Sequence, residues 1–200
     1  IIGIRNIDSK PKYLFQNNLK KLVKNINPYL APTSNIILSK RTKPLSNFPI
    51  MMKGSQPTDG GYLLLDKNQK EDILKIPNFP KNTIKSFYGS NEYINGEEKY
   101  CLWIEDQELA FVSRFNEINQ RLDGVIQMRL NSTKSATNKL AHFPHRFGEI
   151  RYFKKEVIIV PTITSERRDY IPCGFLDEYT IVSNTAQAVY DFLPYMFGVI

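Results

Sequence analysis

The residues whose type and spacing suit a chemical role most clearly are the cations of residues 144–176. They stand on both sides of an apolar run, Val157–Val160, and they are Arg146, Arg151, Lys154, Lys155, Arg167 and Arg168. The apolar run needs a sheet in which to be buried, whereas the cations beside it have no core to enter. This arrangement is typical of a surface that contacts a phosphate backbone, although any basic domain can carry it.

Patterns for catalysis or metal binding are weaker. A Phe-Pro pair separates His142 from His145 and breaks the regular spacing that would bring both rings to one metal, so surface or phosphate-contacting roles are favoured. Gly60-Gly61 precedes a strand rather than a helix, which does not support a nucleotide-binding loop. No serine or cysteine stands in a recognisable nucleophile turn. The fragment is therefore predicted to be non-catalytic.

Composition limits the class of protein. With 200 residues, 42% apolar and 24% charged, the chain is predicted to be one globular domain of ordinary to large size. The excess of 27 Lys and Arg over 20 Asp and Glu gives a net charge of +7, which favours a polyanionic partner. Cys101 and Cys173 lie in apolar surroundings and are interpreted as small buried hydrophobes, which fits a reducing, cytoplasmic setting. No apolar run approaches the ~18 residues of a membrane span, so no membrane partner is expected.

The elements that must position these residues form a β-rich pattern with one long helix. Apolar residues recur at three- and four-residue spacing over 113–130, which predicts that helix, and Trp103 is expected in the core. Three shorter helices are predicted. One covers residues 13–24, one is capped by Asp66 and ends at Leu74, and one is capped by Ser132 and ends at Ala141. Strands are predicted at 1–4, 36–38, 62–65, 150–153, 157–163 and 180–183, and Asn95-Gly96 predicts a hairpin turn between 93–96 and 99–103. The fold class is α+β, with a twisted mixed or mainly antiparallel sheet packed by the long helix.

Several sequence blocks occur in a consistent order over about residues 26–184. They are INPYL (26–30), RTKPL (41–45), GSQPTDGG (54–61), EYING (92–96), CLW (101–103), FGEIR (147–151), SERRDYIP (165–172) and GFL (174–176). In these blocks the chain resembles the target-recognition domain of MmeI-like DNA methyltransferases, a family that includes fused restriction–modification enzymes.

The resemblance implies a parent enzyme of several modules. Residues 1–25 would be the end of a methyltransferase core and its connector, 26–184 the DNA target-recognition domain, and 185–200 the start of a C-terminal helical region. Apolar termini suggest a chain cut from something larger. In such a parent, the methyltransferase core would transfer a methyl group from S-adenosylmethionine to the exocyclic amine of a flipped adenine. This module would select a short sequence in double-stranded DNA. The fragment itself is expected to hold no cofactor and to contact the methyltransferase and helical modules of the same chain.

Within such a module, cations should set the register on phosphates, and a few side chains should read bases. Glu149 and Arg151 are the expected base-reading pair, because alternate strand residues share a face, carboxylate accepts from the cytosine amine, and guanidinium donates twice to guanine. Equally, the two residues could simply pair with each other. Phosphate contacts are expected from Arg41, Lys43, Ser132, Lys134, Lys139, Arg146, Lys154, Ser165, Arg167 and Arg168. For residues 165–168 the alternative is a charged turn in which Glu166 neutralises one arginine.

Two other classes of function stay open. The chain could be part of a catalytic nuclease or RNA-modifying enzyme, or it could be a basic protein-interaction module. A glycine-rich cofactor loop and an Asn-Pro-Pro-Tyr/Phe motif upstream of Ile1 would identify a methyltransferase parent.

Overall fold

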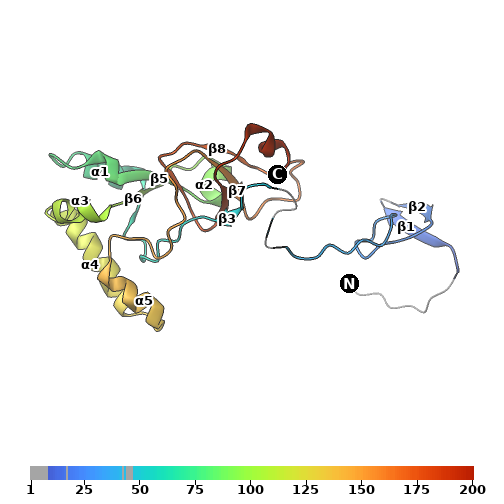
Figure 1. Ribbon diagram of the computed structural model, residues 1–200, viewed down its shortest axis with the longest axis horizontal. Coiled ribbons are helices and arrows are strands. Elements are labelled where there is room, and N and C mark those ends of the chain that lie inside the picture. Colours follow the sequence, from blue (N-terminus) through green and yellow to red (C-terminus); the bar gives the residue numbers. More distant parts are fainter. Residues whose placement is uncertain (1–8, 17, 42, 44–46) are drawn as a thin grey trace. The chain divides into compact units, whose positions relative to one another are not determined.

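The computed structural model describes residues 9–16, 18–41, 43 and 47–200 (Figure 1). The chain divides into two compact units, Ile1–Lys43 and Pro44–Ile200. The strand predicted at 1–4 lies outside the described residues. Within the described ranges, no helix is long and apolar enough to cross a membrane, and no three His, Cys, Asp or Glu side chains gather as metal ligands.

The smaller unit is built on a β-hairpin. Strands β1 (Lys12–Gln16) and β2 (Leu19–Val23) pair antiparallel. The helix predicted over 13–24 is therefore wrong, since short apolar runs fit either periodicity and Asn18 adopts a positive φ of 65° at the turn. The strand predicted at 36–38 is also wrong, because those residues are exposed, irregular chain.

The larger unit contains two four-stranded sheets. The first has the order β3-β10-β7-β8, and every neighbouring pair is antiparallel. Its strands are β3 (Met52–Lys53), β10 (Ala186–Val189), β7 (Val157–Pro161) and β8 (Gly174–Leu176). All five residues of β7 are buried, since apolar clusters pack on both faces of this sheet. The strand predicted over 157–163 is thus confirmed in its apolar part.

The second sheet is mixed, with the order β4-β6-β5-β9. Its strands are β4 (Leu64–Leu65), β6 (Tyr100–Leu102), β5 (Ile84–Tyr88) and β9 (Thr180–Val182). Only β5 and β9 run parallel. The strands predicted near 62–65 and 180–183 are confirmed with shorter bounds.

The described residues of the larger unit also form α-helices and 3₁₀ turns, some of which pack against the second sheet. The α-helices are α1 (Lys67–Leu74), α2 (Ser90–Asn95), α3 (Asp106–Val112), α4 (Asn116–Leu130) and α5 (Ser135–Lys139), and the 3₁₀ turns are η1 (Lys81–Thr83), η2 (Leu140–His142) and η3 (Pro194–Gly198). In Figure 1, α3, α4 and α5 follow one another at one end of the larger unit, and the first sheet lies at the other. The predicted α+β fold is confirmed.

Local capping explains which helix predictions succeeded. The predicted cap at Asp66 is confirmed, because its carboxylate accepts the Gln69 N–H at 2.8 Å. The hairpin predicted at Asn95-Gly96 is wrong, since Gly96 ends α2 with a φ of 68°. A glycine with positive φ ends helices as readily as it makes hairpin turns. Ser132 does not cap a helix directly, because α5 begins at Ser135.

The long helix and the second sheet share one core. Ile118, Leu122 and Val125 of α4 are buried in the same apolar cluster as Leu102 and Trp103. This confirms the predicted helix, its apolar face and the core placement of Trp103. Among the cysteines, Cys101 is fully buried and Cys173 half-buried, both as free thiols, and burial strongly raises the pKa of Cys101.

Candidate nucleic-acid interface

Two segments far apart in the sequence, residues 54–58 and 147–151, lie side by side in the larger unit; we call them the paired segments. The Gln56 N–H donates to the Glu149 carbonyl at 2.9 Å, and the Glu149 N–H donates back at 3.0 Å, which makes an isolated antiparallel bridge. The Gly148 N–H donates to the Pro57 carbonyl at 3.0 Å. Two of the sequence blocks therefore form one structural feature.

Glu149 and Arg151 form an ion pair on the paired segments. Their side chains are 49% and 36% exposed, and an Arg151 Nη also donates to the Gly54 carbonyl at 3.3 Å. The structure thus shows the mutual pairing that was the alternative interpretation. An exposed pair of this kind contributes only about 0–1 kcal/mol. Hydrogen bonds to base edges could replace it at small cost, so base reading stays a prediction.

Residues 150–153 do not form the predicted strand. The Arg151 N–H donates to the Ser55 hydroxyl at 2.9 Å, and the Tyr190 hydroxyl donates to the Arg151 carbonyl at 3.2 Å. Side chains from distant segments therefore satisfy this backbone in place of a strand, and Ile150 and Phe153 stay about half exposed.

Arg129 holds one of the paired segments and the residue that precedes the other. Its side chain is completely buried, and all its hydrogen bonds go to backbone carbonyls, at Pro57 (3.1 Å), Thr58 (2.9 Å), Leu140 (2.8 Å), Phe143 (2.9 Å) and Arg146 (2.7 Å). Burial lowers the pKa of this guanidinium, and the nearby Asp59 carboxylate opposes the shift.

Arg129 was not among the predicted site residues, although its place in the sequence carries a signal. Arg129 follows Ile118, Leu122 and Val125 at helical spacing and so continues the apolar face of α4. A cation in the middle of an apolar stripe must find acceptors in the core, because an unpaired buried charge is very unfavourable. This register marks Arg129 as structural.

Arg146 and His145 both bind the carboxylate of Asp106. The Arg146 Nε donates at 2.7 Å, its Nη makes a second contact, and the His145 Nε2 lies 2.8 Å from the same carboxylate. Arg146, and to a smaller extent His145, hold the pKa of Asp106 down at about 2. His145 is buried, so its expected surface role is wrong. Arg146 remains a predicted phosphate contact, but its guanidinium is already paired.

Ser165, Arg167 and Arg168 form an exposed turn beside a groove. The Ser165 hydroxyl accepts the Arg167 N–H at 3.2 Å, and its carbonyl accepts the Arg168 N–H at 3.1 Å. Over the part of the chain that is described, neither arginine pairs with Glu166. Both guanidinium groups are therefore available to an anion.

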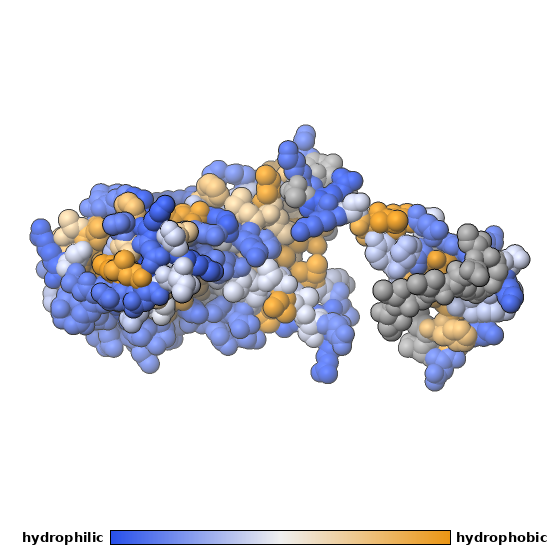
Figure 2. All heavy atoms as spheres, turned by 90° about the horizontal axis from the view of Figure 1, so that it is seen from below, coloured by the Kyte–Doolittle hydropathy of each residue, from blue (hydrophilic) through white to orange (hydrophobic). Residues whose placement is uncertain are grey.

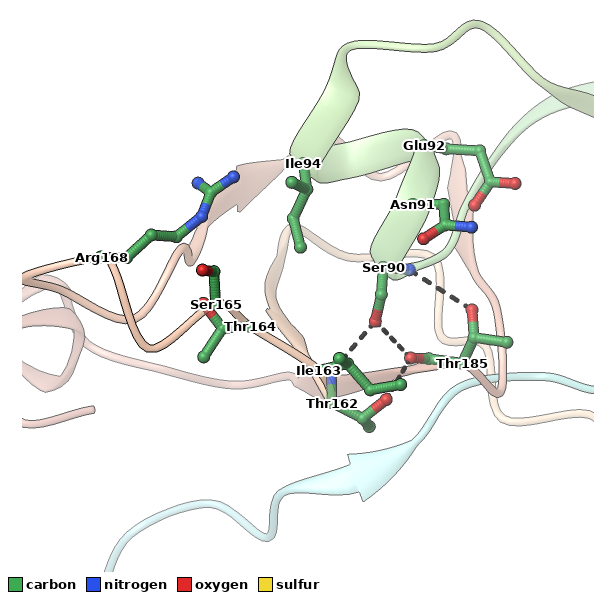
Figure 3. A pocket seen from close by; sticks show the side chains of 10 residues that line it. All are labelled: Ser90, Asn91, Glu92, Ile94, Thr162, Ile163, Thr164, Ser165, Arg168 and Thr185. Carbon is green, nitrogen blue, oxygen red and sulfur yellow. Dashed lines mark hydrogen bonds between the residues drawn. The ribbon is translucent and has the colours of Figure 1, made fainter.

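The groove has a volume of about 580 Å³ and runs from α2 to the segment after β7. Figure 3 shows Arg168 and Ser165 on one side of it and Ser90 with Thr185 on the other. Hydroxyls of Ser90 and Thr162 both donate to the Thr185 carbonyl, so this far wall is held by internal hydrogen bonds. An anion in the groove would thus bind on the side of Arg168.

The remaining predicted phosphate contacts belong to several different segments of the chain. Ser132 accepts the Lys134 N–H at 3.2 Å near the start of α5, and Lys139 ends that helix. Lys154 has its ammonium 6.0 Å from the centre of the Tyr179 ring. Arg41 and Lys43 belong to the smaller unit. On the face drawn in Figure 2, the larger unit is mainly hydrophilic, with apolar side chains in small separate patches.

Comparison with known proteins decides the family. The model of the MmeI target recognition domain matches residues 32–200. This chain belongs to that family. It is similar to "DNA methyltransferase A" of Bacillus subtilis (strain 168), with 38% identity over 206 residues, covering 100% of this chain and 23% of that protein.

A solved relative supports the same assignment. The Type IIL restriction-modification enzyme MmeI, solved in complex with DNA, superimposes with a TM-score of 0.82 and 29% identity, covering 96% of this chain and 27% of that chain. The chain thus spans about a quarter of the length of either relative.

Proposed function

We propose that this chain is the DNA target-recognition module of a longer, site-specific DNA methyltransferase. Membership of the MmeI family, similarity to a protein named DNA methyltransferase A, and likeness to an enzyme solved with DNA support this proposal. The observation that carries it in the structure is the pair of segments on which Glu149 and Arg151 stand exposed, with one segment held by the buried Arg129. A rigidly held backbone that carries exchangeable polar groups suits a surface that reads bases.

Roles divide by chemistry within the proposed module. Glu149 and Arg151 carry an acceptor-only and a donor-only group, which distinguish cytosine from guanine edges. Arg167 and Arg168, with Ser165 between groove and turn, contact phosphates and contribute affinity without sequence preference. The other predicted cations are proposed to contribute further phosphate contacts.

The parent enzyme is proposed to use S-adenosylmethionine to methylate adenine at its exocyclic amine, on a base flipped out of the duplex. None of those steps falls to the residues of this chain. Residues 1–25 and 185–200 are proposed to join it to the methyltransferase core and to a C-terminal helical region, with residues 26–184 as the recognition domain.

A module exchange tests the proposal. Residues 26–184 replace the matching region of DNA methyltransferase A, and methylated sites are mapped in the genome of cells that express the hybrid. The methylated sequence should follow the graft. A hybrid with the host's own region joined at the same boundaries is the control. An active hybrid that keeps the host's sequence would contradict the proposed role.

A further inference from the structure

The position of Gln56 relative to Glu149 was not apparent from the sequence. The two residues are direct partners in the antiparallel bridge, with hydrogen bonds of 2.9 Å and 3.0 Å in both directions. Side chains directly opposite each other in an antiparallel pair project from the same face, with Cβ atoms about 4.5–5.5 Å apart. The Gln56 amide therefore emerges beside the Glu149 carboxylate.

The residues next to Gln56 fix this orientation. Ser55 is completely buried, and its hydroxyl accepts the Arg151 N–H. Its N–H donates to the Val182 carbonyl at 2.7 Å, which ties this segment to β9. Because successive side chains of extended chain point to opposite faces, an inward Ser55 requires an outward Gln56.

The Gln56 amide has no assigned task inside the fold. Its side chain is half-buried, yet among the described residues Gln56 hydrogen-bonds through its backbone alone. A primary amide offers two donors and an acceptor. Gln56 thus combines a fixed backbone with a free hydrogen-bonding group, directly beside the predicted base-reading pair.

We propose that Gln56 is a third base-reading residue, which recognises an A·T pair adjacent to the base pair read by Glu149 and Arg151; this inference rests on the proposed function. Glutamine can donate to adenine N7 and accept from adenine N6, a pattern that neither carboxylate nor guanidinium provides. The spacing to Glu149 is comparable with the rise of about 3.4 Å between successive bases, so neighbouring base pairs are within reach of the two side chains.

The test uses the full-length parent enzyme with Gln56→Ala. Methylated sites are mapped in the genome of expressing cells, and rates are measured on duplexes that carry each single substitution in the mapped sequence. Preference at one A·T position should fall about ten- to a hundredfold, while the other positions stay unchanged. Gln127→Ala, the same chemical change on the exposed side of α4, should leave every position unchanged. A uniform loss of rate on all duplexes, or an unaltered preference, would overturn the proposal.

Gln56→Glu keeps the side-chain length and protects the test against a folding defect. A carboxylate accepts from the cytosine amine and cannot donate to adenine N7, so preference at the same position should move from A·T towards C·G. Retention of the original base there would overturn the assignment. The exchange Glu149→Lys with Arg151→Asp separates the two claims. If it changes the methylated sequence while both Gln56 variants do not, only the Gln56 proposal fails. If none of these variants changes it, base reading by the paired segments fails, and the module exchange then decides whether the chain recognises DNA.

Discussion

Arg129, Arg146 and Arg168 have the same side chain, yet their guanidinium groups have three different surroundings. That of Arg129 is buried among carbonyls, that of Arg146 binds Asp106, and that of Arg168 lies exposed at the groove. The helical register of Arg129 could be seen in the sequence, and the pairing of Glu149 with Arg151 was one of the two interpretations that the sequence offered. The partner of Arg146 lies forty residues away and follows from the fold.

Exposure of Arg168 leads to a prediction about affinity. In the full-length enzyme, Arg168→Ala should weaken binding about equally on all DNA sequences, and the log–log salt slope should fall by roughly one unit, because one phosphate contact is lost. Lys75→Ala, which removes an exposed cation paired with Asp72 on α1, is the control and should leave the slope unchanged. Fluorescence anisotropy at several salt concentrations measures both. An unchanged slope for Arg168→Ala would show that Arg168 is a solvated turn residue and not a phosphate contact.

Asp106 leads to a prediction about pH. Its pKa is held at about 2 in the folded chain, mainly by Arg146, against an ordinary value of 3.8. A lowered folded-state pKa adds stability above the unfolded value, and this contribution is lost as pH falls from about 4 towards 2. Asp106→Asn should therefore lower the free energy of unfolding at pH 6 and match the unsubstituted protein near pH 2. Urea unfolding across this range checks it, and a pH-independent difference would refute the electrostatic account.

Helices were predicted correctly where the sequence signal lies within a single segment. The cap at Asp66 and the apolar spacing of α4 lie within single segments, so both could be inferred. The β1–β2 hairpin was misassigned because its short apolar runs fit either periodicity. The end of α2 was misassigned because a glycine with positive φ occurs in more than one kind of turn. The strand predicted at 150–153 was wrong for another reason: the hydrogen-bond partners of Arg151, Ser55 and Tyr190, lie far away in the sequence.

Arg129 connects α4 to the paired segments, so removal of its guanidinium should destabilise those segments. Arg129→Met leaves buried carbonyls without donors and should lower the free energy of unfolding by about 3–5 kcal/mol. The N–H groups of Gly148 and Glu149 should also exchange hydrogen faster, since their partners at residues 56 and 57 lose this support. Arg114→Met, on an exposed side chain before α4, should change neither quantity. Urea unfolding and hydrogen exchange measure the two effects. Unchanged protection of residues 148 and 149 from exchange would show that the paired segments do not depend on Arg129.

The net charge of the chain and its family both support the proposal that DNA is its partner. The chain carries a net charge of +7, and it matches a recognition-domain family over residues 32–200. Composition alone favoured a polyanion; the ordered sequence blocks made the family visible, and the α+β fold agreed with it. The proposed base contacts are harder to infer from sequence, because they depend on which side chains the paired segments hold on one face.

The chain by itself should bind duplex DNA weakly and in a strongly salt-dependent manner. Its basic side chains release counterions from phosphates, so affinity should fall linearly in a log–log plot against salt. Methyl transfer should be absent, since the cofactor and catalytic motifs are expected in other modules. Anisotropy titrations and incorporation of labelled methyl groups from S-adenosylmethionine check these two outcomes. Methyl transfer by the purified chain would place catalysis within it.

We propose that Glu149 and Arg151 determine part of the methylated sequence. The most direct measurement is genome-wide mapping of methylation by the full-length enzyme with Glu149→Lys and Arg151→Asp. One base pair of the target should change, because a good bidentate contact is worth about 1–3 kcal/mol of discrimination. The control Lys67→Glu with Glu98→Lys reverses another exposed ion pair and should leave the target intact. If the exchanged enzyme is folded and methylates the original sequence at its original rate, Glu149 and Arg151 do not read DNA.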